Sequence, residues 1–184
     1  MRIYFATHGT SEDNEAGIAS GWKDAPLSET GVRQARELGE RFADIHIDLV
    51  CCSDLRRASE TAGIAFAGRV PIVEDARLRE FDYGDLNGAD RDLVFGMNTA
   101  CIDTHYPNGE SCRQAVDRVH DFLRELIHAH PRETVLIVGH RATHHGLDTF
   151  AGRMTLEECM ATTFEWQPHW VYDLPSPGTQ DDGR

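Results

Sequence analysis

Short runs of consecutive apolar residues alternate along the chain with segments of helical periodicity. Residues 3–6 and 135–138 are such runs, and residues 47–52 are similar apart from Asp48. The pattern is typical of strands buried on both faces of a parallel sheet. In residues 32–42 and 116–126 the apolar positions recur every three or four residues, as on one face of a helix. The alternation predicts an α/β fold with three layers, α/β/α, in which helices cover a mostly parallel central sheet.

Two later segments have a weaker pattern. Residues 86–107 contain several turn formers, and we expect them to form a lid-like excursion over one edge of the sheet. Aromatic residues at 164–166 and 170–172 flank Gln167-Pro168-His169, which predicts a β-hairpin.

Length and composition indicate how many domains the chain can form. The 184 residues, 40% of them hydrophobic, suffice for one domain with a substantial core. We find no internal repeat or linker, so we expect a single domain over residues 1–174. Residues 175–184 have the composition of a loose C-terminal tail.

The net charge of −13 restricts the partners of the protein. Acidic residues outnumber Lys and Arg by 31 to 18, whereas nucleic acids and anionic membranes attract clustered basic residues. We therefore expect neither nucleic acid nor a membrane as a partner. A small phosphate ester remains compatible, because a pocket can concentrate positive potential that the net charge hides.

The chain has no apolar run near the ~20 residues of a membrane span, and residues 3–6 are too short for the apolar part of a signal peptide. We therefore expect a cytoplasmic protein. The five cysteines form an odd set without CxxC spacing, which argues against disulfides and a zinc knuckle. Most of them should be reduced and buried.

Candidate chemistry lies where predicted strands end. His8 follows the first strand and His140 follows the strand at 135–138, each beside a glycine. Arg57 falls in the first turn of the helix after the strand at 47–52, where a helix N-terminus and a guanidinium together favour an anion. Open α/β sheets bind ligands beyond the carboxyl ends of their strands, so these residues predict a phosphate site.

Several further motifs occur in a fixed order over nearly the whole chain. They are His8-Gly9 with Asn14; residues 21–31 with Gln34-Ala35; Ser53-Asp54-Leu55 with Arg57-Ala58 and Thr61-Ala62; Leu78-Arg79-Glu80 with Gly84 and Gly88; Pro107 with Gly109-Glu110-Ser111; and Gly139-His140. Each string is weak alone. In this order they resemble the histidine phosphatase superfamily, in its phosphoglycerate-mutase-like branch.

The resemblance implies a phosphoglycerate-mutase-like fold and a phosphatase that forms a phosphohistidine. His8 would be the nucleophile, and Glu80 would be the acid and base for the leaving group and for water. Arg57 and His140 would meet the charge on the phosphoryl oxygens. No metal or organic cofactor is implied, and the partner would be a small phosphorylated metabolite.

The remaining phosphate contacts implied by the resemblance are Asn14 and backbone N–H groups near Gly9. The family carries arginine before its nucleophilic histidine, whereas this chain has Thr7. Threonine offers one neutral hydroxyl in place of a guanidinium that can donate two hydrogen bonds to phosphate. We predict that Arg141, directly after His140, supplies the missing charge. The other interpretation is a site that has moved to another substrate or away from catalysis.

Three alternatives of other classes stay open. Cys51 and Arg57 have the C-x5-R spacing of cysteine-dependent phosphatases, although the residues between them include no glycine. His140, His144 and His145 could bind a metal, because the first two are one helical turn apart. The third alternative is a binding module that holds a phosphorylated ligand without cleaving it.

Within the enzyme interpretation, hydrolysis is favoured over phosphoryl transfer to a second hydroxyl. Mutases exclude water from their intermediate, and residues 89–106 are few for such a lid. Substrate choice should lie in this segment, in Trp22 and in residues 141–145. The sequence leaves the oligomeric state open, including a homodimer.

Overall fold

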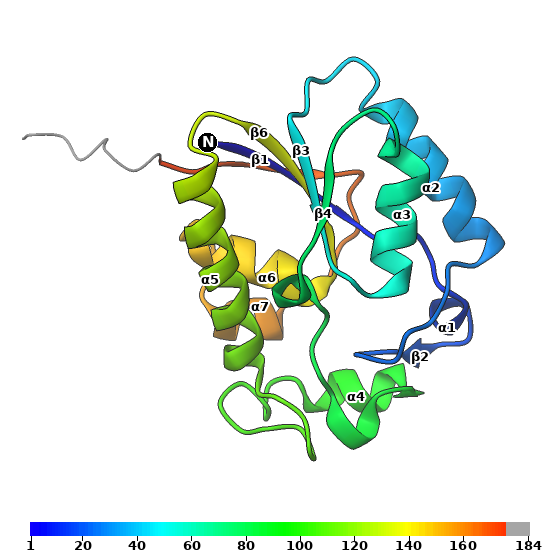
Figure 1. The fold of residues 1–184 in the computed structure, drawn as a ribbon. Coiled ribbons are helices and arrows are strands. Elements are labelled where there is room, and N and C mark those ends of the chain that lie inside the picture. The colour runs from blue at the N-terminus through cyan, green and yellow to red at the C-terminus, as the bar shows by residue number, and fades with distance from the viewer. Residues whose placement is uncertain (176–184) are drawn as a thin grey trace, which may run out of the picture.

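The computed structural model describes residues 1–175, so residues 176–184 of the predicted tail lie outside the described part. Its main sheet has five strands in the order β4-β3-β6-β1-β7 (Figure 1). Neighbouring strands run parallel, except that the edge strand β7 is antiparallel to β1. The strands are β1 (Arg2–Thr7), β3 (Leu49–Cys52), β4 (Ile72–Glu74), β6 (Thr134–Gly139) and β7 (Trp170–Asp173).

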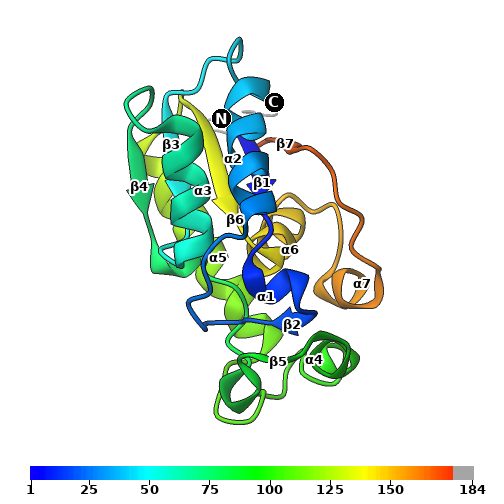
Figure 2. The ribbon, with the colours of Figure 1, turned by 90° about the vertical axis from the view of Figure 1, so that its right-hand side faces the viewer.

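Four long helices cover the sheet. Helices α2 (Glu29–Arg41) and α3 (Arg56–Phe66) lie on one face, and α5 (Cys112–Ala129) and α6 (Arg141–Phe150) lie on the other (Figures 1 and 2). The predicted α/β fold with a mostly parallel central sheet is therefore confirmed. Both helices predicted from apolar periodicity are present, as α2 and α5.

The continuous apolar runs are explained by burial on both faces of the sheet. In β6, Val135 and Ile137 pack with residues of α5 and α6, while Leu136 and Val138 pack with residues of α2 and α3. A strand with helices on both sides has no polar face, so its sequence does not alternate.

The remaining elements are short and gather near the carboxyl ends of the parallel strands. The predicted lid contains β5 and α4, and α4 lies beyond those strand ends (Figure 1). These elements are α1 (Glu12–Glu15), β2 (Ile18–Ala19), η1 (Ala76–Leu78), η2 (Gly84–Leu86), β5 (Ala89–Asp90), α4 (Arg91–Met97) and α7 (Leu156–Ala161).

The predicted hairpin at residues 164–172 is wrong. Residues 164–166 form no strand, and β7 pairs instead with β1, for example Trp170 with Phe5. The exposed side of β1 offers a longer ladder of backbone hydrogen bonds than a three-residue local hairpin would. Phe164 and Trp166 are thereby left free to line a cleft.

The register of β1 and β6 brings the two predicted histidines together. Thr7 lies opposite Gly139, and the His8 backbone N–H donates to the Gly139 carbonyl at 3.0 Å. His8 and His140 therefore directly follow the paired ends of two adjacent strands. Because β3 pairs with the other side of β6, the turn after β3 delivers Arg57 to the same end of the sheet.

Packing of α5 against α6 fixes the helix that starts after His140. A methyl group on Gly146 of α6 would overlap the Val119 side chain of α5, whereas a methyl group on Gly63 of α3 would have no atom within 4 Å. We predict that Gly146→Ala lowers the free energy of unfolding by about 1–3 kcal/mol through overpacking. Gly63→Ala should instead raise it by about 0.5–1 kcal/mol.

Urea unfolding monitored by circular dichroism checks this pair of variants. Equal effects of the two substitutions would contradict a close contact of α5 with α6.

Candidate active site

His8 stands immediately after β1 with one ring nitrogen already engaged. Its Nδ1 lies 2.6 Å from the Gly9 carbonyl oxygen, which can only accept, so Nδ1 carries a proton and Nε2 keeps its lone pair when the ring is neutral. Burial, reinforced by the nearby charge of Arg57, lowers the pKa of His8 to about 3. The ring is therefore neutral at pH 7, as a nucleophile must be.

His140 ends β6 and faces His8, with ring centroids 4.9 Å apart. It is 1% exposed, and within residues 1–175 neither ring nitrogen has a hydrogen-bond partner. Burial and the charge of Arg57 hold its pKa well below the usual value. A buried imidazole without a partner costs stability, and an anionic oxygen in the cleft would supply one.

Arg57 lies in the first turn of α3 and is 2% exposed. Its Nη2 donates to the Gly21 carbonyl at 2.8 Å and its Nη1 to the Lys23 carbonyl at 3.1 Å. These two bonds fix the plane of the guanidinium. The positive charge of Arg57 lowers the pKa of both His8 and His140, so the guanidinium acts electrostatically on both rings.

Glu80 reaches the start of α6 from a segment on the other side of the site. Its Oε1 accepts the backbone N–H groups of Phe81 and Ala142, each at 3.0 Å, and its Oε2 accepts that of Arg141 at 3.3 Å. The first N–H groups of a helix have no partner within the helix. The carboxyl group satisfies two of them and is held directly beside His140.

A cleft of about 520 Å³ opens between these groups. Its walls come from the strand ends, from α4 and from the segment before β7. Of the residues predicted for the site it contains Thr7, His8, Asn14, Glu80, His140 and Arg141, and its other lining residues are Thr10, Gln34, Arg91, Phe95, Phe164 and Trp166. Arg57 is buried and does not form part of this lining.

Asn14 and Gly9 differ in what they can offer a ligand. The Asn14 Oδ1 accepts the Ser11 N–H at 3.0 Å in the cap of α1, which leaves the amide nitrogen to donate into the cleft. The Gly9 N–H already donates to Thr61 Oγ1 at 3.0 Å. Gly9 is needed for close packing, because a Cβ there would collide with the backbone of Gly31.

Arg141 lines the cleft but is already bonded. Its Nε donates to His145 Nε2 at 3.1 Å, and its guanidinium lies over the Phe95 ring, 4.6 Å from the centroid. A guanidinium only donates, so the Asn98 amide must turn its oxygen toward it, where Nη1 and Nη2 are 3.2 and 2.8 Å away. Arg141 thus connects α6 to the predicted lid.

The sequence prediction missed part of the outer wall of the cleft. Arg91 and Phe95 come from the segment expected to choose the substrate, but Phe164 and Trp166 come from the supposed hairpin. Trp166 is 63% exposed, a feature no local pattern reveals. Trp22, expected to contact substrate, does not line the cleft and instead donates its Nε1–H to the Glu80 carbonyl at 2.7 Å.

Two alternative chemistries lack structural support. Cys51 is packed in the core between the sheet and α5, and burial raises its pKa to about 12, so it is not a thiolate. It also does not line the cleft. All five cysteines are unpaired and buried. Within the described residues, no group of three or more His, Cys, Asp or Glu side chains could hold a metal ion.

None of the helices in residues 1–175 combines the length and apolar character needed to cross a bilayer.

Comparison with known proteins places the chain in a family. The model of the histidine phosphatase superfamily (branch 1) matches residues 3–168. PhoE of Bacillus subtilis, named as an uncharacterized phosphatase, is 38% identical over 148 residues, which span 80% of this chain and 75% of that protein.

A second relative and a solved structure extend the match. A 2,3-bisphosphoglycerate-dependent phosphoglycerate mutase of Parvibaculum lavamentivorans is 31% identical over 194 residues, covering 96% of this chain and 91% of the mutase. The structure of Bacillus stearothermophilus YhfR superposes with a TM-score of 0.82 at 28% identity, covering 94% of this chain and 91% of that one. The chain belongs to the histidine phosphatase superfamily, among relatives named as phosphatases and as phosphoglycerate mutases.

Proposed function

We propose that this protein hydrolyses a small phosphomonoester through a phosphohistidine at His8. The observation that carries the proposal is the neutral ring of His8, whose Nδ1 is tied to the Gly9 carbonyl. That contact directs reactivity to Nε2. Nearby lie a buried Arg57 and His140, whose ring nitrogens have no hydrogen-bond partner among residues 1–175.

In the first step, His8 Nε2 attacks phosphorus as the bond to the ester oxygen breaks. Protonated Glu80 gives its proton to the departing alcohol. The ring becomes positive on forming the N–P bond, and its Nδ1–H remains bonded to the Gly9 carbonyl. Arg57 and His140 meet the charge on the non-bridging oxygens without reorganising.

In the second step, a water molecule attacks phosphorus and the N–P bond breaks. The Glu80 carboxylate takes the proton from water, which restores its acid form. The products are inorganic phosphate and neutral His8. No metal or organic cofactor enters this scheme.

Hydrolysis is favoured over mutase chemistry by the cover of the cleft. α4 has only seven residues, and Trp166 at the rim is 63% exposed, so water can reach the intermediate. A mutase must exclude water. The relative named as a phosphoglycerate mutase suggests a test of the mutase alternative. Exchange between 2- and 3-phosphoglycerate without release of inorganic phosphate would favour mutase activity.

The covalent intermediate can be trapped directly. The reaction is quenched without acid during turnover of a phosphomonoester. Intact-mass analysis should then show one added phosphoryl group on the wild type and none on His8→Asn. The turnover rate of His8→Asn should fall at least about 10³-fold. His120→Asn, altered outside the cleft lining, is the matched control. Tight phosphate binding without any phosphoprotein would instead support a binding module.

The protonation state of His8 gives a test that needs no substrate. Followed by imidazole nitrogen NMR between about pH 4 and 8, the His8 ring should stay neutral across the range. Arg57→Met should raise the pKa of His8, because removing a cation stabilises the imidazolium. The value should remain below that of an ordinary histidine, because burial is the larger cause and persists. A ring that is charged at pH 6 in the wild type would contradict the proposal.

The departure at Thr7 is tested by restoring the family residue. We predict that Thr7→Arg raises kcat/KM about tenfold, since a charge-assisted pair replaces one neutral hydroxyl. If Arg141 compensates for Thr7, Arg141→Ala should cost more in the wild type than in the Thr7→Arg background. Thr7→Val controls for the loss of the hydroxyl. Equal losses from Arg141→Ala in both backgrounds would remove the compensation hypothesis.

A further inference from the structure

The segment that carries Glu80 lacks backbone support of its own. Residues 79–83 belong to no helix or strand, and carbonyl groups in such a segment need other donors. An acid/base group must nevertheless be held within hydrogen-bonding reach of the reacting oxygen. Something outside the segment must therefore fix it.

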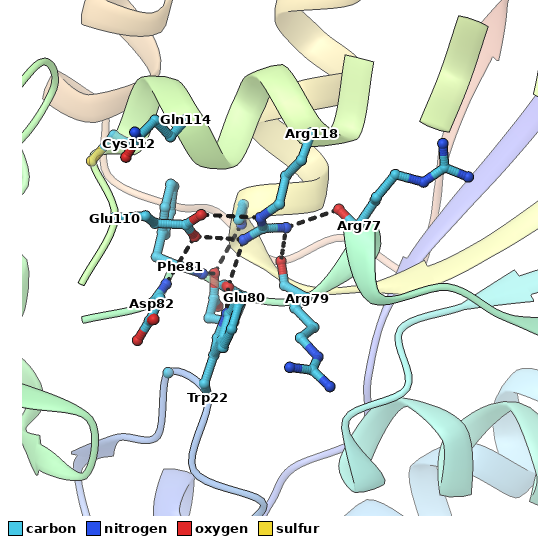
Figure 3. Close-up of polar contacts among 12 residues, drawn as sticks. Trp22, Arg77, Arg79, Glu80, Phe81, Asp82, Glu110, Cys112, Gln114 and Arg118 are labelled. Carbon is cyan, nitrogen blue, oxygen red and sulfur yellow. Dashed lines mark hydrogen bonds and ion pairs between the residues drawn. The ribbon is translucent and has the colours of Figure 1, made fainter. Parts of the chain in front are cut away.

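Arg118 of α5 supplies those donors (Figure 3). Its Nη1 donates to the carbonyls of Arg77 and Arg79 at 2.8 and 2.7 Å, and its Nη2 donates to the carbonyl of Glu80 at 2.8 Å. Its Nε and Nη2 also donate to Glu110, at 3.1 and 2.6 Å. These contacts occupy the five N–H donors of a guanidinium.

Glu110 extends the same support past Glu80. Besides pairing with Arg118, its Oε1 accepts the backbone N–H of Asp82 at 2.9 Å. Arg118 and Glu110 are only 17% and 15% exposed, so water screens their interaction weakly. Their contacts therefore run from residue 77 to residue 82, on both sides of Glu80.

Trp22 also supports the backbone of residues 77–82. Its Nε1–H donates to the same Glu80 carbonyl that accepts from Arg118, and its ring lies under the guanidinium of Arg79, 4.8 Å from the centroid. The Glu80 carbonyl thus has two fixed donors. With the main chain held there, the side chain extends to the N–H groups of Arg141 and Ala142.

We propose that Arg118, paired with Glu110, is a positioning residue that holds Glu80 in place for proton transfer to the leaving group. The inference rests on the proposed function and deepens it. Arg118 does not line the cleft, so it acts through the backbone of residues 77–82. The forked guanidinium of Arg118 is essential. A lysine at this position would keep the positive charge but could not span three carbonyls and a carboxylate.

The test compares two substrates whose leaving groups differ in basicity. Phenyl phosphate needs a proton on its departing oxygen far more than 4-nitrophenyl phosphate does, because phenolate is the stronger base. For each ester, kcat/KM reports the steps up to departure of the alcohol, so dephosphorylation of His8 does not enter the comparison. The variants are Arg118→Lys, Glu110→Gln, Glu80→Gln and the double variant Arg118→Lys with Glu80→Gln.

With phenyl phosphate, we expect kcat/KM to fall about 100-fold in Glu80→Gln and about tenfold in Arg118→Lys and Glu110→Gln. With 4-nitrophenyl phosphate, each loss should be below about threefold, because little proton donation is needed. The double variant should match Glu80→Gln alone, since Arg118 acts only through that carboxyl. Inhibition by inorganic phosphate should be unchanged in Arg118→Lys.

Arg113→Lys is the matched control on the same helix. Arg113 forms ion pairs with Asp103 and Glu157 at the surface, so its loss should affect neither ester. Equal losses with both esters in Arg118→Lys, or added losses in the double variant, would make Arg118 a residue of fold stability and overturn the inference. A wild type that forms no phosphohistidine would instead overturn the proposed function, and the inference with it.

Discussion

The pairing of β1 with β6 is the constraint on which the site depends. Both strands are buried on both faces, and Thr7 opposite Gly139 sets where each one ends. A shift of one residue would turn the apolar side chains of each strand toward the wrong helices, so core packing enforces the register. The same register places His8 next to His140. The geometry of this histidine pair is thus a consequence of how the hydrophobic core packs.

Around that pair the fold arranges charge that would suit an anion. A cation, Arg57, is buried beside two imidazoles that remain neutral, and His140 has no hydrogen-bond partner within residues 1–175. Each of these features is unfavourable by itself, because burial penalises a charge or a polar group that has no partner. A phosphoryl group would relieve them together. The overall charge of −13 is no obstacle, because the field inside a narrow cleft is set by the nearest groups.

The sequence predicted those parts whose cause is local or periodic. Apolar runs located β1, β3 and β6, and strand ends located His8 and His140, because strand burial and ligand placement follow general rules. The pairing of β7 with β1 could not be predicted, since it depends on which strand edge is free after the sheet assembles. For the same reason Phe164 and Trp166 were missed in the cleft. Trp22 was predicted to help choose the substrate, but it does not line the cleft. Its indole instead supports the Glu80 backbone, a contact across 58 residues that no motif reveals.

The burial of every cysteine has a consequence for the chemistry proposed at His8. Burial raises the pKa of Cys51, Cys52 and Cys112 to about 12, so these thiols stay protonated and react slowly with peroxides and disulfides. The residues that line the cleft include no cysteine. Phosphatases built on a thiolate lose activity when an oxidant reaches that sulfur, whereas an imidazole nucleophile has no such sensitivity. The phosphoryl transfer proposed at His8 would therefore be insulated from the redox state of its surroundings.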